Sequence, residues 1–279
     1  MKSISCFTAL VLGSCFSMGA VAAEPLRTAV DGTFAPHAMP SLGGGLQGFN
    51  VDLGQAIAKQ MGREITIDSA EFSGLMPGLN ARKYDFLVAP VTVTPERAEN
   101  LLFTEGYLDS DYTFVQKKGA APITSLDQLK GKTLAVNKGS NYEGWAKQNA
   151  EQYGFTFDVY SSNADAIQAL LSGRADANIS GSTVAGWAAK QNPQLETSYT
   201  IQSGQFWAIA FRKDDVAGRD AVNLALKCLK HNGTVVELAQ KWFGYTPDAE
   251  SAAAKIQPGF GVQGLPGYEA KDVALECGA

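Results

Sequence analysis

The sequence has few residues that could hold a metal ion or form a catalytic site. It contains 2 histidines, His37 and His231, and 4 cysteines in 279 residues. Neither Cys228 nor Cys277 has a histidine or another cysteine at metal-ligand spacing, and no G-x-S-x-G or H-E-x-x-H pattern occurs. We therefore expect no metal, no cofactor and no catalytic residue, and we predict that the protein is not an enzyme.

Runs of basic residues are missing as well. The chain has 23 Lys and Arg against 28 Asp and Glu, a formal net charge of −5. Nucleic acids and anionic membrane surfaces attract clustered positive charge, so this composition argues against both as partners. We expect a monomer that binds no nucleic acid.

Long apolar runs are absent after the first residues. Lys2 is followed by apolar or small residues from 4 to 21 and then by further small residues, which is the order of a secretory signal peptide. Its most apolar stretch, 7–12, is too short to span a bilayer. We predict a cleaved signal peptide over 1–23 and a periplasmic protein. Leu12-Gly13-Ser14-Cys15 resembles a lipobox, so a lipoprotein stays open as an alternative.

The cysteines form two groups. Cys6 and Cys15 lie in the expected signal peptide and would leave with it. Cys228 and Cys277 remain as an even pair in an oxidising compartment, which favours one disulfide. Two unpaired thiols are the alternative.

The rest of the chain predicts alternating strands and helices, which is typical of α/β proteins with mostly parallel sheets. Periodicity and stop signals predict helices over 52–61, 75–81, 141–152 and 165–171, and another that starts at Pro95 behind a Thr94 cap. Short β-prone segments predict strands over 27–31, 64–70, 84–89, 133–137, 155–160 and 177–180.

Two lobes are expected at this length, because a single core is near its limit. The segments 79–86 and 171–177 each close a helix and open a strand through a basic residue and an aspartate, which suggests lobes of similar build. Two extended segments, 111–117 and 205–212, are candidates for paired strands that cross between the lobes and act as a hinge.

One glycine-rich segment matches a nucleotide-binding pattern. Gly43-Gly44-Gly45-Leu46-Gln47-Gly48 fits G-x-G-x-x-G. A dinucleotide loop must connect a strand directly to a helix, whereas Pro36 and Pro40 separate this segment from the strand before it. We interpret it as a loop or hairpin tip.

Several short motifs follow one another over most of the chain. They are Asp31-Gly32-Thr33-Phe34-Ala35-Pro36, Gly48-Phe49-Asn50-Val51-Asp52-Leu53, Phe72-Ser73-Gly74-Leu75-Met76-Pro77, Val91-Thr92-Val93-Thr94-Pro95-Glu96-Arg97, Asn137-Lys138-Gly139-Ser140, Gly173-Arg174-Ala175-Asp176 and Lys241-Trp242-Phe243-Gly244. In this order and spacing the chain resembles the extracellular solute-binding proteins of polar amino-acid ABC importers, family 3 of the periplasmic binding proteins.

The resemblance implies an α/β fold of the periplasmic-binding-protein-like type II, with two lobes joined by two crossing strands and the ligand in the cleft. On this basis we divide the chain into lobe 1 (24–111 and 206–244), an inserted lobe 2 (112–205) and a C-terminal tail packed on lobe 1 (245–279). The implied function is capture of a polar amino acid, or a derivative, by lobe closure for an ABC permease in the inner membrane.

The implied site depends most on Arg97. In the first turn of a helix, its guanidinium stands beside free backbone N–H groups and the positive dipole end, and it can hold a carboxylate bidentately. Gly139, Ser140 and Asn141 begin a helix in the second lobe and offer N–H donors from the opposite wall. One anion touched by both lobes makes closure favourable. Helix capping is the alternative role of Ser140.

Three further residues would surround the rest of the ligand. Phe34 and Phe72 match the aromatic positions that flank the ligand side chain in the family, where flat walls suit an aliphatic stem, a planar group or a cation. Asp31 follows the first strand, where open α/β sheets place ligand groups, and would accept a distal donor. Its alternative role is to cap the next turn.

One position departs from the family pattern. The family typically holds the ligand's α-ammonium with an acidic residue five positions after the Asp of Gly-Arg-x-Asp, and here that position is Gly181. The Pro90 carbonyl, the Thr92 hydroxyl and Ser180 would then serve a neutral or substituted amine. Because loss of the acid also leaves volume, a ligand with a bulky N-substituent, as in opines, or without a free α-amine is an alternative to a polar amino acid.

An enzyme on the same fold, similar to a cyclohexadienyl dehydratase, is the alternative of another class. Such an activity needs a positioned acid or base in the cleft. His37 follows Pro36 near the expected cleft and is a candidate. His231 lies at a helix end, where it complements the dipole.

Overall fold

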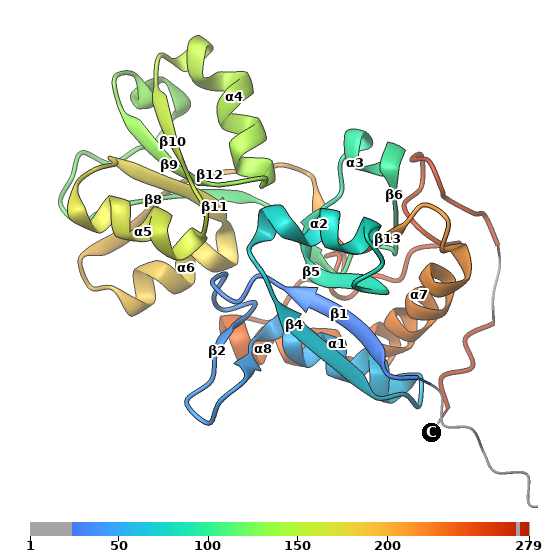
Figure 1. Ribbon diagram of the computed structural model, residues 1–279. Helices are drawn as coiled ribbons and strands as arrows, with labels where there is room; N and C mark the ends of the chain where they lie inside the picture. The colour runs from blue at the N-terminus through green and yellow to red at the C-terminus, as the bar shows by residue number, and fades with distance from the viewer. Residues whose placement is uncertain (1–23, 272–273, 279) are drawn as a thin grey trace, which may run out of the picture.

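The computed structural model describes residues 24–271 and 274–278. The predicted signal peptide therefore lies outside the described residues. Figure 1 shows two lobes side by side, each with sheet and helices. Within the described ranges, none of the helices combines the length and the apolar character that a membrane span requires.

The first lobe is built from the two ends of the described chain. Its elements are β1 (Leu26–Val30), β2 (Met39–Pro40), β3 (Leu46–Gln47), α1 (Phe49–Gln60), β4 (Ile65–Ser69), α2 (Phe72–Asn80), β5 (Phe86–Thr92), α3 (Pro95–Asn100), β6 (Leu101–Phe103), β7 (Leu108–Asp109), β13 (Phe206–Arg212), α7 (Val216–His231) and α8 (Thr234–Phe243). β1 pairs in parallel with β4. β13 pairs antiparallel with β5, β6 and β7.

The second lobe is formed by the middle of the chain. Its elements are β8 (Tyr112–Lys117), the 3-10 helix η1 (Leu126–Leu129), β9 (Thr133–Asn137), α4 (Asn141–Tyr153), β10 (Thr156–Tyr160), α5 (Asn163–Ser172), β11 (Ala177–Gly181), α6 (Ser182–Gln191) and β12 (Leu195–Ile201). Its sheet has the order β10-β9-β11-β8-β12. β9 and β11 are parallel, so their carboxyl ends lie at one edge, and α4 and α6 begin beside that edge.

The chain crosses between the lobes twice. It leaves the first lobe between β7 and β8 and returns between β12 and β13, so the segments 111–117 and 205–212 each lie at a crossing. This topology confirms the predicted α/β fold with two lobes. The predicted helices and strands agree with the observed ones to within three residues at their ends.

The glycine-rich segment forms the tip of a hairpin. β2 and β3 pair antiparallel, and between them Gly44 and Gly45 adopt φ values of 90° and 75°. Glycine adopts this left-handed region without a steric penalty. The hairpin prediction is confirmed.

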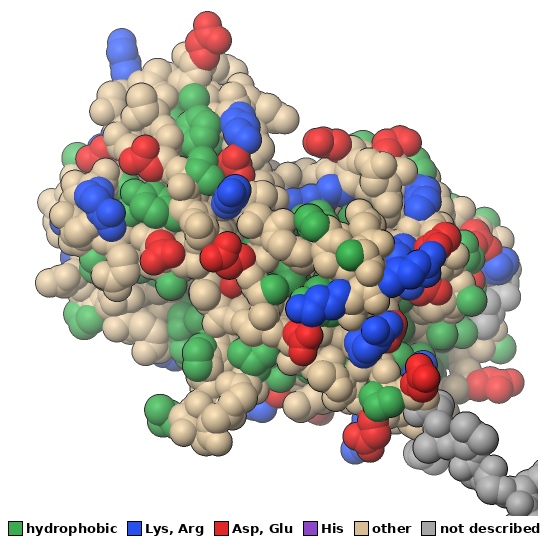
Figure 2. Space-filling model, viewed as in Figure 1, with side chains coloured by type: hydrophobic (Ala, Val, Ile, Leu, Met, Phe, Trp, Pro, Cys, Tyr) green, Lys and Arg blue, Asp and Glu red, His purple; other side chains and the backbone are tan. Residues whose placement is uncertain are grey.

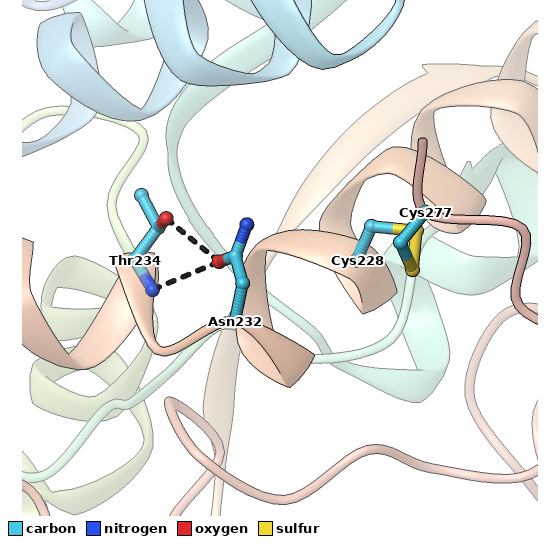
Figure 3. The surroundings of a disulfide bond; sticks show 4 residues. All are labelled: Cys228, Asn232, Thr234 and Cys277. Atoms are coloured by element: carbon cyan, nitrogen blue, oxygen red, sulfur yellow. Dashed lines mark hydrogen bonds between the residues drawn. A yellow bond between two sulfur atoms is a disulfide. The ribbon is translucent and has the colours of Figure 1, made fainter. Parts of the chain in front are cut away.

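The segment 244–271, which follows α8, runs along the first lobe (Figure 1). Arg219, buried in α7, donates to the Gly267 carbonyl across 2.7 Å and to the Glu269 carboxylate across 3.2 Å. Cys228 of the same helix forms the predicted disulfide with Cys277, with the Cα atoms 5.2 Å apart (Figure 3). α7 therefore holds the tail at two points.

Candidate functional site

Arg97 lies in the first turn of α3, at the boundary between the lobes. Thr94 caps this helix as predicted, since its hydroxyl accepts from the backbone N–H of Arg97 across 3.2 Å. The guanidinium donates to the Thr92 carbonyl across 2.8 Å and to the carbonyl of Gly139, in the second lobe, across 3.1 Å. Its carbon lies 5.9 Å from the centre of the Phe72 ring. This side chain therefore joins the two lobes.

No carboxylate among the described residues lies within ion-pair distance of the Arg97 guanidinium. Burial lowers its pKa, and this shift is opposed by the ionisable groups of Tyr112, Tyr142 and Glu96. A desolvated cation gains most from an anion that supplies charge and hydrogen-bond acceptors together. The guanidinium is thus suited to hold a carboxylate.

Arg97 lines a hollow of about 790 Å³ that both lobes share. Gly139, Ser140 and Asn141 line the same hollow from the second lobe, and Figure 2 shows the surface hollowed between the lobes. A volume of several hundred Å³ accommodates a small molecule. The hollow does not include the other residues predicted for the site, which are Asp31, Phe34, Phe72, Pro90, Thr92, Ser180 and Gly181.

Several polar groups at the N-terminus of α4 already have hydrogen-bond partners within the protein. The Ser140 hydroxyl accepts from the backbone N–H of Glu143 across 3.2 Å, which is the helix-capping role given above as its alternative. The backbone N–H of Gly139 donates to Glu143 Oε2 across 2.6 Å. The Asn141 amide donates to the Gln205 side chain across 2.8 Å. These bonds fix the geometry of the wall opposite Arg97.

Asp31 and Phe34 are buried in the loop after β1. Asp31 Oδ1 accepts from the backbone N–H and the hydroxyl of Thr33 across 2.9 and 2.7 Å, so the carboxylate does cap the turn. Its Oδ2 is buried without a hydrogen-bond partner. Because an unsatisfied buried acceptor costs free energy, this oxygen remains suited to a donor. The Phe34 ring packs edge-on against Trp207, with centres 6.5 Å apart.

The groups predicted to bind the ligand amine in place of the missing acid differ in whether they already have hydrogen-bond partners. The Thr92 hydroxyl accepts from the Trp207 indole across 3.1 Å and bonds to the Ser110 hydroxyl across 3.2 Å. Pro90 is buried within β5. The Ser180 hydroxyl is buried without a partner. Of the two predicted hydroxyls, that of Ser180 is therefore the one left for another molecule.

The space beside Gly181 is filled. A Cβ built on Gly181 would lie 2.6 Å from Cη2 of Trp207 and 2.9 Å from the Tyr142 hydroxyl. Trp207 comes from β13 of the first lobe, and Tyr142 comes from α4. The expectation that loss of the acid leaves volume here is wrong, because an indole from the other lobe occupies that volume.

Three large residues at this boundary were not among the predicted site residues, namely Trp207, Tyr142 and Tyr112. The Tyr112 hydroxyl donates to the Gln205 side chain across 2.5 Å and lines the hollow. A signal was present, because Tyr112 and Trp207 both stand in the predicted crossing segments. Side chains of strands that pass between two lobes lie close to the cleft.

The fold and the shared hollow define a two-lobed solute-binding protein. A model of the bacterial extracellular solute-binding proteins, family 3, matches residues 26–245. The chain belongs to this family, so the family and its substrate-binding role in ABC transport are confirmed. Members of this family are extracellular proteins, which agrees with the predicted secretion to the periplasm.

Individual relatives are similar along most of their length. The arginine-binding extracellular protein ArtP of Bacillus subtilis is 35% identical over 206 residues, which cover 72% of this chain and 79% of the relative. The structure of an ancestral arginine-binding protein bound to arginine has a TM-score of 0.75 at 35% identity, and covers 79% of this chain and 98% of its own. An ancestral amino-acid-binding protein described as a precursor of cyclohexadienyl dehydratase has a TM-score of 0.73 at 31% identity, and covers 78% and 95%.

Proposed function

We propose that this protein captures a polar amino acid, or a close derivative, by gripping its carboxylate at Arg97 as the lobes close, and delivers it to an ABC permease in the inner membrane. One observation carries the proposal. The Arg97 guanidinium contacts the second lobe through the Gly139 carbonyl and has no carboxylate partner among the described residues. A ligand carboxylate there would complete the contact between the lobes.

The proposed ligand carries a distal hydrogen-bond donor. Asp31 Oδ2, buried and without a partner, would accept from that donor. The rings of Phe34 and Phe72, both nearly buried, would flank the stem. The relative ArtP and the ancestral structure are named for arginine, a ligand with both a carboxylate and a distal cation. L-Arginine is therefore the first ligand to test.

A ligand with a bulky group on its α-nitrogen is less well supported. That alternative relied on open volume at Gly181, and Trp207 with Tyr142 fills it. An opine-like ligand would have to displace the Trp207 indole from its hydrogen bond to Thr92. The filled space leaves the ordinary amino acid, or an acid without a free amine, as the better fit.

The enzyme alternative loses its candidate base. Both ring nitrogens of His37 are already bonded, Nδ1 to Asn50 across 2.7 Å and Nε2 to Thr183 across 2.7 Å. A general base needs a free acceptor within reach of its substrate. Relatives of this chain are named mostly as binding proteins, with one ancestral precursor of a dehydratase. We propose a binding protein without catalytic activity.

Calorimetric titration with L-arginine tests the proposal. Replacement of Arg97 by Met keeps the stem but removes the charge, and should weaken binding at least about thirtyfold, since truncating a buried charge partner costs 2 kcal/mol or more. Arg82→Met is the matched control, because the Arg82 side chain is 65% exposed and pairs with Asp214. Equal affinity of the Arg97→Met variant and the native protein would contradict the proposal.

A thermal-shift panel of amino acids, opines and deaminated acids extends the test if L-arginine does not bind. A ligand that binds the closed lobes raises the melting temperature. The same two variants are then titrated with the strongest ligand of the panel. Failure of every carboxylate in the panel to bind would also contradict the proposal.

A further inference from the structure

His37 is fixed in place at the start of α1. Its backbone carbonyl accepts from the N–H of Asn50 across 3.0 Å, in the first turn of the helix. Gly48 allows this close approach, since a Cβ at that position would lie 2.3 Å from the His37 carbonyl oxygen. The imidazole is fully buried and lies against the rings of Trp207 and Phe243, with centres 4.8 and 5.2 Å away. Its side chain therefore has little freedom to move.

The hydrogen-bond network determines which nitrogen of His37 carries the proton. The Asn50 amide nitrogen donates to the Val88 carbonyl across 2.5 Å and to the Tyr107 hydroxyl across 2.6 Å. The amide oxygen of Asn50 therefore faces His37 Nδ1 at 2.7 Å and accepts from it. In the neutral ring, Nε2 then carries no hydrogen and can only accept a hydrogen bond.

The Nε2 atom of His37 accepts a hydrogen bond from the second lobe. His37 Nε2 lies 2.7 Å from the hydroxyl of Thr183, which stands in the first turn of α6. The hydroxyl must donate, because Nε2 has no hydrogen to give. This bond joins side chains of the two lobes and uses no ligand, unlike the contact expected at Arg97. Because its two side chains belong to different lobes, we expect the bond to break when the lobes separate.

We propose that His37 and Thr183 form a latch which stabilises lobe closure without ligand and is most effective while His37 is neutral, because closure would bury a charged imidazole among uncharged groups. His37 and Thr183 do not contact the ligand in this proposal. They change the population of the closed state, and through it the affinity for ligand. This inference rests on lobe closure as the capture mechanism, but not on the identity of the ligand.

The surroundings of His37 oppose its protonation. Burial lowers its pKa from 6.5 to about 4, against the opposing effect of the bond to Asn50. The groups that face the ring are Asn50 of α1, Thr183 of α6, Trp207 of β13 and Phe243 of α8, together with Phe34 and Phe49. These groups are all uncharged. The titratable group of the network is Tyr107, whose pKa burial raises, so it stays neutral as well.

The sign of the pH dependence follows from these facts. Opening the lobes gives Nε2 access to water and moves its pKa back toward 6.5, so the open state binds a proton more readily than the closed state. The latch is therefore fully effective above pH 6.5 and is progressively lost as the pH falls toward 4. At pH 5.5 the closing equilibrium constant falls by up to about tenfold.

Single-molecule energy transfer on the ligand-free protein tests the latch. Dyes are attached at Lys59→Cys on α1 and Asp158→Cys on β10, both exposed positions in different lobes. We expect a closed population at pH 7.5 that decreases severalfold at pH 5.5. Thr183→Val should shift the protein toward the open state, and Thr183→Ser should restore closure, because serine keeps the hydroxyl.

His37→Gln should make the closed population independent of pH between 7.5 and 5.5. His231→Gln is the matched control, since His231 is exposed and should leave the pH dependence unchanged. A native protein that is always open at pH 7.5, or a Thr183→Val variant as closed as the native protein, would overturn the latch. Because no ligand is used, that failure would leave the proposal for Arg97 standing.

Discussion

The indole nitrogen of Trp207 donates to the Thr92 hydroxyl across 3.1 Å, while the far edge of the same ring lies against Gly181. The Trp207 side chain thus connects the first lobe to the end of β11 in the second lobe. It also occupies the position at which the family typically places an acidic residue.

Gly181→Asp should destabilise the protein by about 1–3 kcal/mol, because the new side chain would overlap the indole. Adding Trp207→Ala should recover part of this loss and raise the affinity for free α-amino acids, since a carboxylate would then meet the ammonium. Urea denaturation and calorimetry measure the two effects. Gly186→Asp is the control, because nothing lies within 4 Å of a Cβ at Gly186. An equal loss in both single variants would contradict the packing argument.

Removal of the disulfide should destabilise the first lobe without changing ligand affinity. The bond between Cys228 and Cys277 closes a separation of 49 residues, for which we expect a loss of about 2–4 kcal/mol in a Cys228→Ser, Cys277→Ser variant. Neither cysteine lines the hollow at Arg97. Thermal unfolding with calorimetric titration checks both statements, and a change in affinity without a change in stability would refute them.

A buried carboxylate that is shared by two lysines should be sensitive to removal of its charge. Glu105 Oε1 lies 2.6 Å from Lys230 Nζ, Glu105 Oε2 lies 2.5 Å from Lys227 Nζ, and all three residues are almost fully buried. Glu105→Gln leaves both ammonium groups without their counter-charge, so we expect a loss of about 3–5 kcal/mol in urea denaturation. Glu250→Gln removes an exposed pair with Lys255 and should change stability by less than about 1 kcal/mol. Similar effects of the two changes would show that burial of the Glu105 cluster does not matter.

The buried His37 should also make folding stability depend on pH. Its pKa is about 4 in the folded protein against 6.5 as the ordinary value, so the unfolded chain binds the proton more readily. Stability attributable to His37 is therefore complete above pH 6.5 and falls by up to about 1.4 kcal/mol per pH unit between 6.5 and 4. Urea denaturation at pH 7.5 and 5.5 should show this loss in the native protein and a smaller one in His37→Gln. Identical losses in both would contradict the assignment.

Local features of the site could be predicted from the sequence because they depend on neighbouring residues. The Thr94 cap and the Pro95 start place Arg97 in the first turn of α3 whatever the rest of the chain does. In the same way, a short β-prone segment predicted β9, and helical periodicity predicted α4 from Asn141 onward. Adjacent glycines marked the β2–β3 hairpin. Each of these interactions spans only a few residues.

Local sequence patterns are enough to specify the alternation of strands and helices, the placement of Arg97 in the first turn of a helix, and the pair of cysteines available for a disulfide. The tertiary structure alone decided that Trp207 fills the space at Gly181 and that His37 bonds to Thr183, 146 positions away. Secondary structure follows from local periodicity and capping, which a sequence displays directly. Contacts between lobes depend on which side chains two separate sheets bring together, and no local pattern records that.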